Sequence, residues 1–357
     1  MLLAPLREED SDRLFAWIND RDLVISSAPF KPVERADHDA WFAAIRQRDD
    51  VRIFGIRVDE RLIGSCQLHS IADGSAELQI RIGERDQQGR GYGRAAVERL
   101  LAYAFGELRL RQVTLHVFES NAAARAVYGK TGFREVAAPP ETVEIEGRAE
   151  RVIQMVRPHV VAIHQPNFFP WLGYFDKLAR ADTFVLLDTV EFSKGSRTNR
   201  VEIEVNGEPH WITAPVQRAG IGRPIADVVF DEQRDWRTKI VKTLQQNYAG
   251  VEAVEDLVRC GESRLAAYNE HAIRQLAAKL AIATPFVRAS DLAVDGRASE
   301  LLIAIVRAVG GGAYLAGGGA GGYQDDAAFA AAGIDLIPQE FDAPHGLSVL
   351  HELLARR

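Results

Sequence analysis

The chain has 357 residues, of which 47% are hydrophobic and 26% charged, and its formal net charge is −7. This length favours two domains, and the composition is that of a globular enzyme. The negative charge argues against a protein that coats nucleic acid, and no apolar run is long enough to cross a bilayer. Acidic residues from Glu8 onward do not fit a signal peptide, so we expect a cytoplasmic protein. Cys66 and Cys260 lack metal-ligand spacing and are expected to be buried.

The first elements are a strand over residues 1–6 and an amphipathic helix capped by Asp10 or Ser11. Residues 21–32 are expected to be irregular and are interpreted as an acceptor-side loop. His38 and Trp41 follow on one helix and face the same side, which makes them candidate substrate contacts. For Trp41, packing in the core is the favoured interpretation.

A glycine-rich stretch separates an expected strand over residues 76–82 from an expected helix over residues 95–107. Glycines let the backbone turn tightly and bring N–H groups close to a ligand. The start of the following helix adds its positive dipole end, and arginines suit phosphate oxygens. The stretch therefore predicts a pyrophosphate cradle, with an ordinary turn as the alternative; its members are Gln88, Gly89, Arg90, Gly91, Tyr92, Gly93 and Arg94.

After a strand over residues 112–118 come Glu119-Ser120-Asn121 and a helix that ends in Val127-Tyr128-Gly129, followed by Gly132-Phe133. In this motif order, residues 1–157 resemble the GNAT superfamily of acetyl-CoA-dependent N-acetyltransferases. They are particularly similar to the enzymes that acetylate ribosomal-protein N-termini or nucleotide-linked 4-amino sugars. The resemblance implies a GNAT fold, a mixed and twisted sheet flanked by helices, with acetyl-CoA as cofactor.

The resemblance also implies roles for single residues. Tyr128 would protonate the coenzyme A sulfur, with packing near Phe133 as its alternative. Asn121 would hydrogen bond to the pantetheine or cap the following helix. Glu77 would take the proton of the amine, unless it is a solvated strand residue. The backbone N–H groups around Ile80 and Ile82 would polarise the thioester carbonyl.

Arg157-Pro158-His159 predicts a domain boundary, because proline restrains its neighbours and interrupts a strand ladder. We expect a first domain over residues 1–157 and a second over 158–357. The second domain begins with apolar strands at residues 160–164 and 183–188, which indicates an α/β domain with a largely parallel sheet.

Polar residues follow these two strands, where α/β proteins place their sites. Three basic residues after the second strand would suit a diphosphate. A structural network is the alternative, and a histidine such as His164 that ends an apolar strand is often a core residue. No metal-ligand spacing is present. We expect acid–base and carboxylate roles for His164 and Asp188, and substrate binding by Gln165, Asn167, Lys194, Arg197, Asn199 and Arg200.

Residues 158–345 resemble the WbqC-like family, which is associated with polysaccharide and O-antigen gene clusters. Its motifs are His164-Gln165-Pro166, Leu187-Asp188, Asn199-Arg200 and Trp236-Arg237. The glycine-rich stretch that contains Gly317 and Gly319 also matches a dinucleotide-binding fingerprint. A flexible loop is the alternative interpretation of this stretch. The same residues have a fainter likeness to nucleotidylyltransferases. Those enzymes have a second histidine where this chain has Tyr174. The resemblance adds Trp171, Tyr174, Lys177, Gly317, Gly319 and Tyr323 to the candidate substrate-binding residues.

Together these features predict a bifunctional or fused enzyme of surface-polysaccharide sugar biosynthesis. The first domain would acetylate the amine of a nucleotide-linked amino sugar, and the second would modify a related sugar, as a second acyl or aminoacyl transferase. One alternative is acetylation of protein N-termini, with the second domain as a binding or interaction module. The sequence leaves homo-oligomerisation open.

Overall fold

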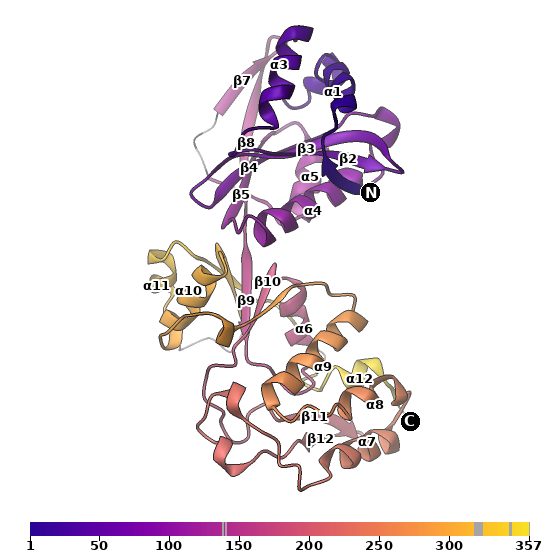
Figure 1. The fold of residues 1–357 in the computed structure, drawn as a ribbon, viewed down its shortest axis with the longest axis vertical. Helices are drawn as coiled ribbons and strands as arrows, with labels where there is room; N and C mark the ends of the chain where they lie inside the picture. Colours follow the sequence, from indigo (N-terminus) through magenta and orange to yellow (C-terminus); the bar gives the residue numbers. More distant parts are fainter. Residues whose placement is uncertain (138, 140, 318–323, 343–344, 357) are drawn as a thin grey trace. The chain divides into compact units, whose positions relative to one another are not determined.

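The structure is a computed structural model that describes residues 1–137, 139, 141–317, 324–342 and 345–356 (Figure 1). It divides into two compact units, Met1–His159 with Gly310–Gly312, and Val160–Val309 with Ala313–Arg357. Each unit has hydrophobic clusters of its own, formed by residues from within that unit. Cys66 is buried as expected, whereas Cys260 is only half-buried. No helix in the described ranges is both long and apolar enough to span a membrane.

The first unit is built on one mixed sheet in the order β1-β2-β3-β4-β5-β8-β6, with β7 paired to β8. All neighbours are antiparallel except β4 and β5, which run parallel. The mixed sheet that the sequence predicted is therefore confirmed. The strands are β1 (Leu2–Pro5), β2 (Arg52–Val58), β3 (Arg61–Ala72), β4 (Ser75–Ile82), β5 (Gln112–Phe118), β6 (Arg134–Glu135), β7 (Glu141–Ile145) and β8 (Arg148–Pro158).

The parallel ladder between β4 and β5 is short. It joins residues 75–77 to residues 112–114 and ends at the pair Glu77 and Thr114. Beyond this point β4 stays paired only with β3, while β5 stays paired with β8. The two strands therefore separate, and one edge of β4 from Leu78 to Ile82 is open to a ligand.

In the described part of this unit, five α-helices accompany the sheet, and apolar residues of these helices pack against it. Residues 21–24 form a short helix, which corrects the expectation of an irregular loop. The carboxylate of Asp20 accepts a hydrogen bond from the N–H of Leu23 and so caps this helix. The helices are α1 (Ser11–Ile18), α2 (Arg21–Val24), α3 (Arg35–Ile45), α4 (Tyr92–Gly106) and α5 (Ala122–Lys130).

The second unit has a five-stranded sheet in the order β14-β10-β9-β15-β16, and all its strands run parallel. Within this unit β9 comes first in the sequence. Strands β10 and β14 follow on one side of it, and β15 and β16 are added later on the other side. The order thus reverses between β9 and β15, and this switch point is where open α/β sheets bind ligands. The strands are β9 (Val160–His164), β10 (Thr183–Leu186), β14 (Phe286–Arg288), β15 (Ala313–Ala316) and β16 (Asp335–Pro338).

Outside this sheet lie a predicted hairpin and several helices. The hairpin turns at Asn206 and Gly207, which both adopt the positive φ that such a tight turn requires. Helix α6 connects β9 to β10 and lies beside the sheet in Figure 1. The remaining elements are α6 (Leu172–Ala179), β11 (Arg200–Val205), β12 (Glu208–Thr213), α7 (Trp236–Asn247), β13 (Tyr248–Ala249), α8 (Glu252–Val258), α9 (Leu265–Lys279), α10 (Ala298–Ala308), α11 (Asp326–Ala331), α12 (Leu350–Leu353) and β17 (Ala355–Arg356).

Candidate functional site

The glycine-rich loop leads from the end of β4 into helix α4. Gly89 and Gly91 have φ angles of 73° and 83°, and Gly91 is the N-cap of the helix. A Cβ atom added to either glycine would have no atom within 4 Å, so the loop borders open space. The side-chain amide of Gln88 donates to the carbonyl oxygen of Ile82 at 2.9 Å and ties the loop to β4.

The first N–H groups of α4 face this open space without intrahelical partners, because Ala95 is the first residue to donate back to Gly91. Tyr92 and Gly93 are half-buried at this end. Arg90 is exposed, and Arg94 forms an exposed ion pair with Glu98 at 2.8 Å. Backbone donors and flexible basic side chains therefore surround one space that fits a diphosphate.

The open edge of β4 presents backbone donors in line with this loop. Gly83 donates to the carbonyl oxygen of Ile63 on β3. Because N–H groups alternate sides along a strand, those of Ile82 and Ile80 point toward the side from which β5 has separated. The residues present thus fit an acyl-CoA, whose pantetheine arm has amide groups to pair with such an edge.

Glu77 lies where the two strands part, on the sheet face opposite the core. Its carboxylate Oε1 is 2.9 Å from Nδ1 of His116 on β5 and 3.9 Å from Nε2 of His69 on β3. All three side chains are partly exposed. Sequence reasoning missed both histidines, although strand alternation puts His116 on the face opposite the buried Leu115 and Val117.

A small cavity of about 120 Å³ adjoins His116. Its wall includes Glu119, Glu135 and Arg151, and the acidic groups are partly paired: Glu119 with Arg151 and Glu135 with Arg125. The cavity is linked to Glu77 through His116, which lines it and contacts the carboxylate of Glu77.

Arg81 lies on the same sheet face as Glu77, four residues further along β4. Between them the side chains of Gln67 and Gln79 hydrogen bond across β3 and β4 at 2.6 Å, which marks the shared face. Arg81 is half-buried, and desolvation lowers its pKa from the usual value. In the described part of the chain its guanidinium forms no ion pair.

Tyr128 on α5 is buried and packs edge-on against Phe133, with ring centroids 5.8 Å apart. Burial raises the pKa of its hydroxyl to about 12, so the group stays protonated at neutral pH. At the start of α5, Asn121 accepts from the N–H of Ala124 at 3.0 Å. Its amide also donates to the carbonyl oxygen of Ser26 and so fixes the loop after α2. Asn121 thus has the capping position that the sequence indicated.

On α3, His38 and Trp41 differ in burial. His38 is buried, and its Nε2 lies within hydrogen-bond distance of the Oγ and carbonyl oxygen of Ser11. Trp41 is 40% exposed, so the favoured interpretation of Trp41 as a core residue is wrong. The helix buries His38, Phe42 and Ile45, and Trp41 falls beside this stripe, where a substrate could reach it.

In the second unit, four predicted residues meet at the carboxyl end of β9. His164 packs against the ring of Tyr174, with centroids 4.8 Å apart. The hydroxyl of Tyr174 donates to the carbonyl oxygen of Gln165. Lys177 is buried, and its Nζ donates to the carbonyl oxygen of Ile163 at 2.9 Å. Burial, together with the charge of Lys177, lowers the pKa of His164 to about 4, which keeps the imidazole neutral.

Other predicted residues have partners within the protein. Both carboxylate oxygens of the buried Asp188 accept from Ser290, one from its N–H and one from its hydroxyl. The side-chain amide of Asn199 donates to the carbonyl oxygen of Ala214. Asp188 and Asn199 therefore hold neighbouring segments in place.

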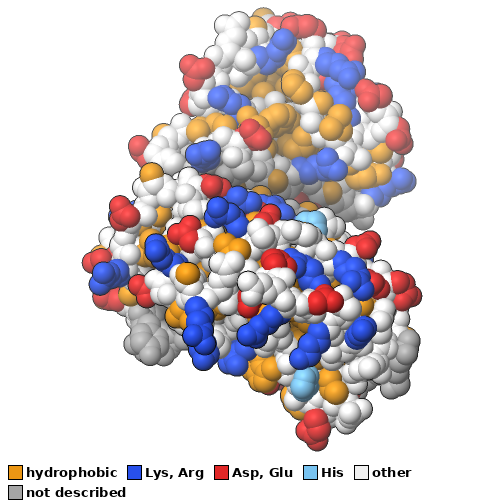
Figure 2. All heavy atoms as spheres, turned by 60° about the horizontal axis from the view of Figure 1, so that its bottom comes forward, with side chains coloured by type: hydrophobic (Ala, Val, Ile, Leu, Met, Phe, Trp, Pro, Cys, Tyr) orange, Lys and Arg blue, Asp and Glu red, His pale blue; other side chains and the backbone are white. Residues whose placement is uncertain are grey.

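The predicted basic cluster lies on and before the β11–β12 hairpin. The guanidinium groups of Arg197 and Arg200 lie 5.3 Å and 4.3 Å from the ring centroid of Trp211. Lys194 is exposed. On the near face in Figure 2, Lys and Arg side chains are interspersed with Asp and Glu. Mixed charge of this kind does not by itself define an anion site.

The remaining candidates lie along the loop after β9 and after β15. Asn167 is buried, and Trp171 covers Gly173, where a Cβ atom would stand 2.2 Å from the indole ring. Gly317 follows β15 and is half-buried. Gly319 and Tyr323 lie outside the described residues.

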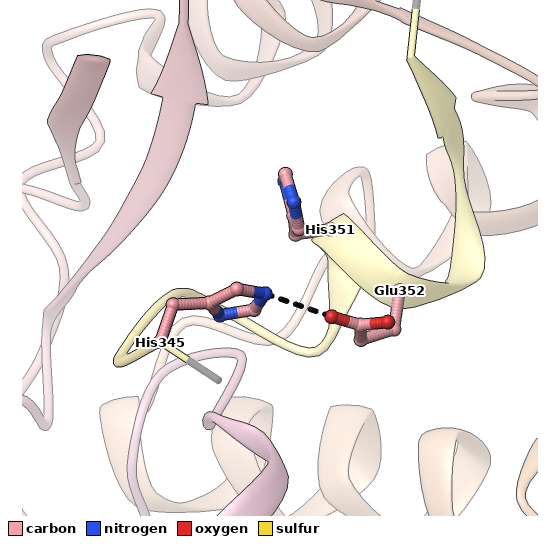
Figure 3. A group of neighbouring side chains, drawn as sticks. All are labelled: His345, His351 and Glu352. Carbon is pink, nitrogen blue, oxygen red and sulfur yellow. Dashed lines mark ion pairs between the residues drawn. The ribbon is translucent and has the colours of Figure 1, made fainter. Parts of the chain in front are cut away.

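The structure also brings together a group that sequence spacing did not indicate. Ligand atoms of His345, His351 and Glu352 all lie within 4.8 Å of one another (Figure 3). Nε2 of His345 pairs with Glu352 at 2.8 Å, and Nδ1 of His351 is 3.1 Å from the hydroxyl of Tyr248. An ion pair and a hydrogen bond thus account for the arrangement.

Two known protein families match parts of this chain. Residues 1–134 match the acetyltransferase (GNAT) domain, and residues 165–345 match the WbqC-like protein family. The cradle, the open strand edge and the GNAT match define an acetyl-CoA-dependent N-acetyltransferase, as the sequence predicted. Because the second match covers about half of its length, the chain belongs to the WbqC-like protein family.

Individual relatives match parts of the chain. An uncharacterized protein of Mycobacterium tuberculosis, Rv1507c, is 26% identical over 51% of this chain and 82% of its own. Spermidine N(1)-acetyltransferase of Vibrio cholerae is 37% identical over 27% of this chain and 56% of its own. A solved structure of the Vibrio cholerae enzyme with CoA and spermine is 30% identical, with a TM-score of 0.41, over 44% of this chain and 94% of its own.

Proposed function

We propose that the protein transfers the acetyl group of acetyl-CoA to the amine of a nucleotide-linked amino sugar. The proposal rests on Glu77 and Arg81, which share one face of β4 four residues apart. Four residues of strand span about 13 Å, which suits a sugar amine at one end and a diphosphate at the other. The guanidinium of Arg81 would then meet phosphate oxygens, for which arginine has matching donors.

The chemical steps fall to residues around the open edge of β4. Acetyl-CoA supplies an acetyl group that its thioester activates. Glu77 takes the proton from the attacking amine, and His116 holds the carboxylate in place at 2.9 Å. The N–H groups of Ile80 and Ile82 stabilise negative charge on the carbonyl oxygen. Tyr128 returns a proton to the departing thiolate.

A polyamine is the second candidate acceptor. It is favoured by the match to spermidine N(1)-acetyltransferase and by the glutamates around the cavity next to His116. Against it, carboxylates near the end of β4 are already neutralised. Asp20 and Asp22 pair with Arg85, and Glu84 pairs with Arg13 and Arg61. A polycation would have to displace these arginines.

The acceptor can be decided by measuring acetylation of UDP- and dTDP-linked 4-amino sugars, spermidine and N-terminal peptides under the same conditions. We expect turnover of a nucleotide-linked amino sugar, and Arg81→Gln should raise its KM by at least about tenfold because a charged hydrogen bond to phosphate is lost. The matched variant Gln79→Ala, on the same face, should change KM little. Turnover of spermidine or peptides alone would reject the amino-sugar proposal.

We further propose domain boundaries at 1–157 and 158–357, with the second domain modifying a related sugar of surface polysaccharide. Membership in the WbqC-like family and the polar end of β9 support a site there. Neither of these two observations identifies the sugar or the group that is transferred to it.

A further inference from the structure

Lys177 carries a buried positive charge that no carboxylate of the described residues neutralises. The side chain is 3% exposed, and its Nζ donates one hydrogen bond, to the carbonyl oxygen of Ile163. Among the described residues no carboxylate lies within ion-pair distance of this ammonium group. The residues outside the described ranges carry no acidic side chain. A buried ammonium without an anion is costly, and such groups usually have a ligand or a paired charge.

The ammonium group lies at the switch point of the parallel sheet. Its hydrogen-bond partner Ile163 belongs to β9, and the ring of Tyr314 on β15 is 5.4 Å from Nζ. A Cβ atom at Gly317, just after β15, would stand 3.7 Å from the same nitrogen. Lys177 therefore reaches between the carboxyl ends of the two strands that flank the reversal in strand order, where open α/β sheets bind ligands.

The neighbouring groups are polar, and the carboxylate of Asp176 near them is paired with Arg180 at 3.6 Å. Oε1 of Gln339, which follows β16, would lie 3.9 Å from a Cβ atom at Gly317. Its Nε2 is held by the carbonyl oxygen of Gly173 and by Asp176, so the amide is fixed. His164 is kept neutral, and glycine at 317 lets a ligand approach the backbone closely. The switch point thus combines an ammonium group that lacks a paired carboxylate with fixed hydrogen-bonding groups.

We propose that this switch point binds the diphosphate group of a nucleoside diphosphate, with Lys177 as its counter-charge. The site differs from the basic cluster of Lys194, Arg197 and Arg200, two of which already stack on Trp211. This proposal deepens the proposed function, because it assigns a nucleotide-linked substrate to the second domain. Only the sugar part of that substrate rests on the proposed function.

Calorimetric titration of the full-length protein with UDP and with dTDP tests the assignment. Lys177→Met keeps the length and apolar stem of the side chain but removes the charge, and should weaken binding by at least about tenfold because a charge-assisted contact is lost. Lys242→Met, which changes an exposed lysine of α7, is the matched control and should change the affinity less than about twofold. Thermal unfolding of each variant checks that it is folded.

A second variant keeps the charge and fills the space. Gly317→Val places a branched side chain beside Nζ and should also weaken binding of UDP. Parental affinity in both Lys177→Met and Gly317→Val would overturn the proposal, as would a parent that binds neither nucleotide. Acetylation assays on the same Lys177→Met preparation separate the two proposals, because they report only on the first domain.

Discussion

In the proposed reaction, the departing thiolate receives its proton from the phenol group of Tyr128. Its hydroxyl is buried with a pKa raised to about 12, so it remains a proton donor throughout the working pH range. Tyr128→Phe should leave the affinity for acetyl-CoA unchanged and lower kcat by about 100-fold or more, as removal of a general acid does. Calorimetry and single-turnover kinetics measure the two effects. An unchanged single-turnover rate would assign Tyr128 to packing against Phe133.

Lys177 gives the second domain a pH dependence whose sign follows from burial. Desolvation lowers the pKa of its ammonium group from 10.5 to about 8. The charge is therefore present below about pH 8 and lost above it, so the affinity for UDP should fall between pH 7 and pH 9. The surrounding groups do not titrate there, because His164 is neutral above about pH 4 and the pKa values of Tyr174 and Tyr314 are raised.

The same measurement on Lys177→Met supplies the comparison. That variant should bind weakly at every pH in the range, without the decrease of the parent. A parental affinity that stays constant from pH 7 to pH 9 would show that the ammonium group does not contact the nucleotide.

Single residues show where sequence reasoning reaches its limit. The place of Glu77 on the strand that borders the cofactor could be anticipated, but the parting of β4 and β5 at this residue and its contact with His116 depend on the register between strands distant in sequence. Likewise, His38 and Trp41 were placed on one helix face, yet which of them is buried depends on the width of the covered stripe. Burial of a borderline position is decided by tertiary packing, which no local pattern contains.

At the scale of elements, the glycine-rich loop and helix α4 form one unit that can be tested by substitution. Gly91→Glu introduces a negative charge into the open space at the helix start and should abolish acetyl-CoA binding. Any non-glycine residue is also strained at a φ of 83°. Gly147→Glu is therefore the matched control, since Gly147 has a φ of 77° and equally open surroundings, in the turn between β7 and β8.

Calorimetry with acetyl-CoA compares the two variants after thermal unfolding has shown a similar loss of stability. Retained affinity in Gly147→Glu with none in Gly91→Glu would locate the cofactor at α4. Equal affinities in both would remove the loop from the cofactor site.

Elements with strong local signals were predicted well. The Asn206-Gly207 hairpin and the strand–loop–helix unit at residues 76–106 follow from turn chemistry and periodicity. Helix α2 was missed because four residues provide little periodicity, and its stability depends on capping by Asp20. The end of the β4–β5 ladder was also unpredictable, since strand separation leaves no mark in the sequence of either strand.

For the whole molecule, the resemblances in the sequence indicated two domains, but not how the second sheet is ordered. The apolar runs of β9 and β10 predict parallel strands, while β14 beside β10 and β15 beside β9 come from 100 residues or more further along the chain. The switch point therefore appears only once the long-range pairing is known. That pairing places Lys177, previously one motif residue among many, between β9 and β15.

Separate cores predict that the two sites operate independently. The clusters of the first unit draw on residues up to Met155, and those of the second begin at Val160. A substitution at one site should therefore leave the other unaffected, because substitutions in separate packed clusters usually combine additively. In full-length protein, Tyr128→Phe should abolish most acetylation but bind UDP as the parent does, while Lys177→Met should lose UDP binding but keep parental kcat for acetylation. If Lys177→Met lowered kcat to the level of Tyr128→Phe, the two domains would have to share one catalytic cycle.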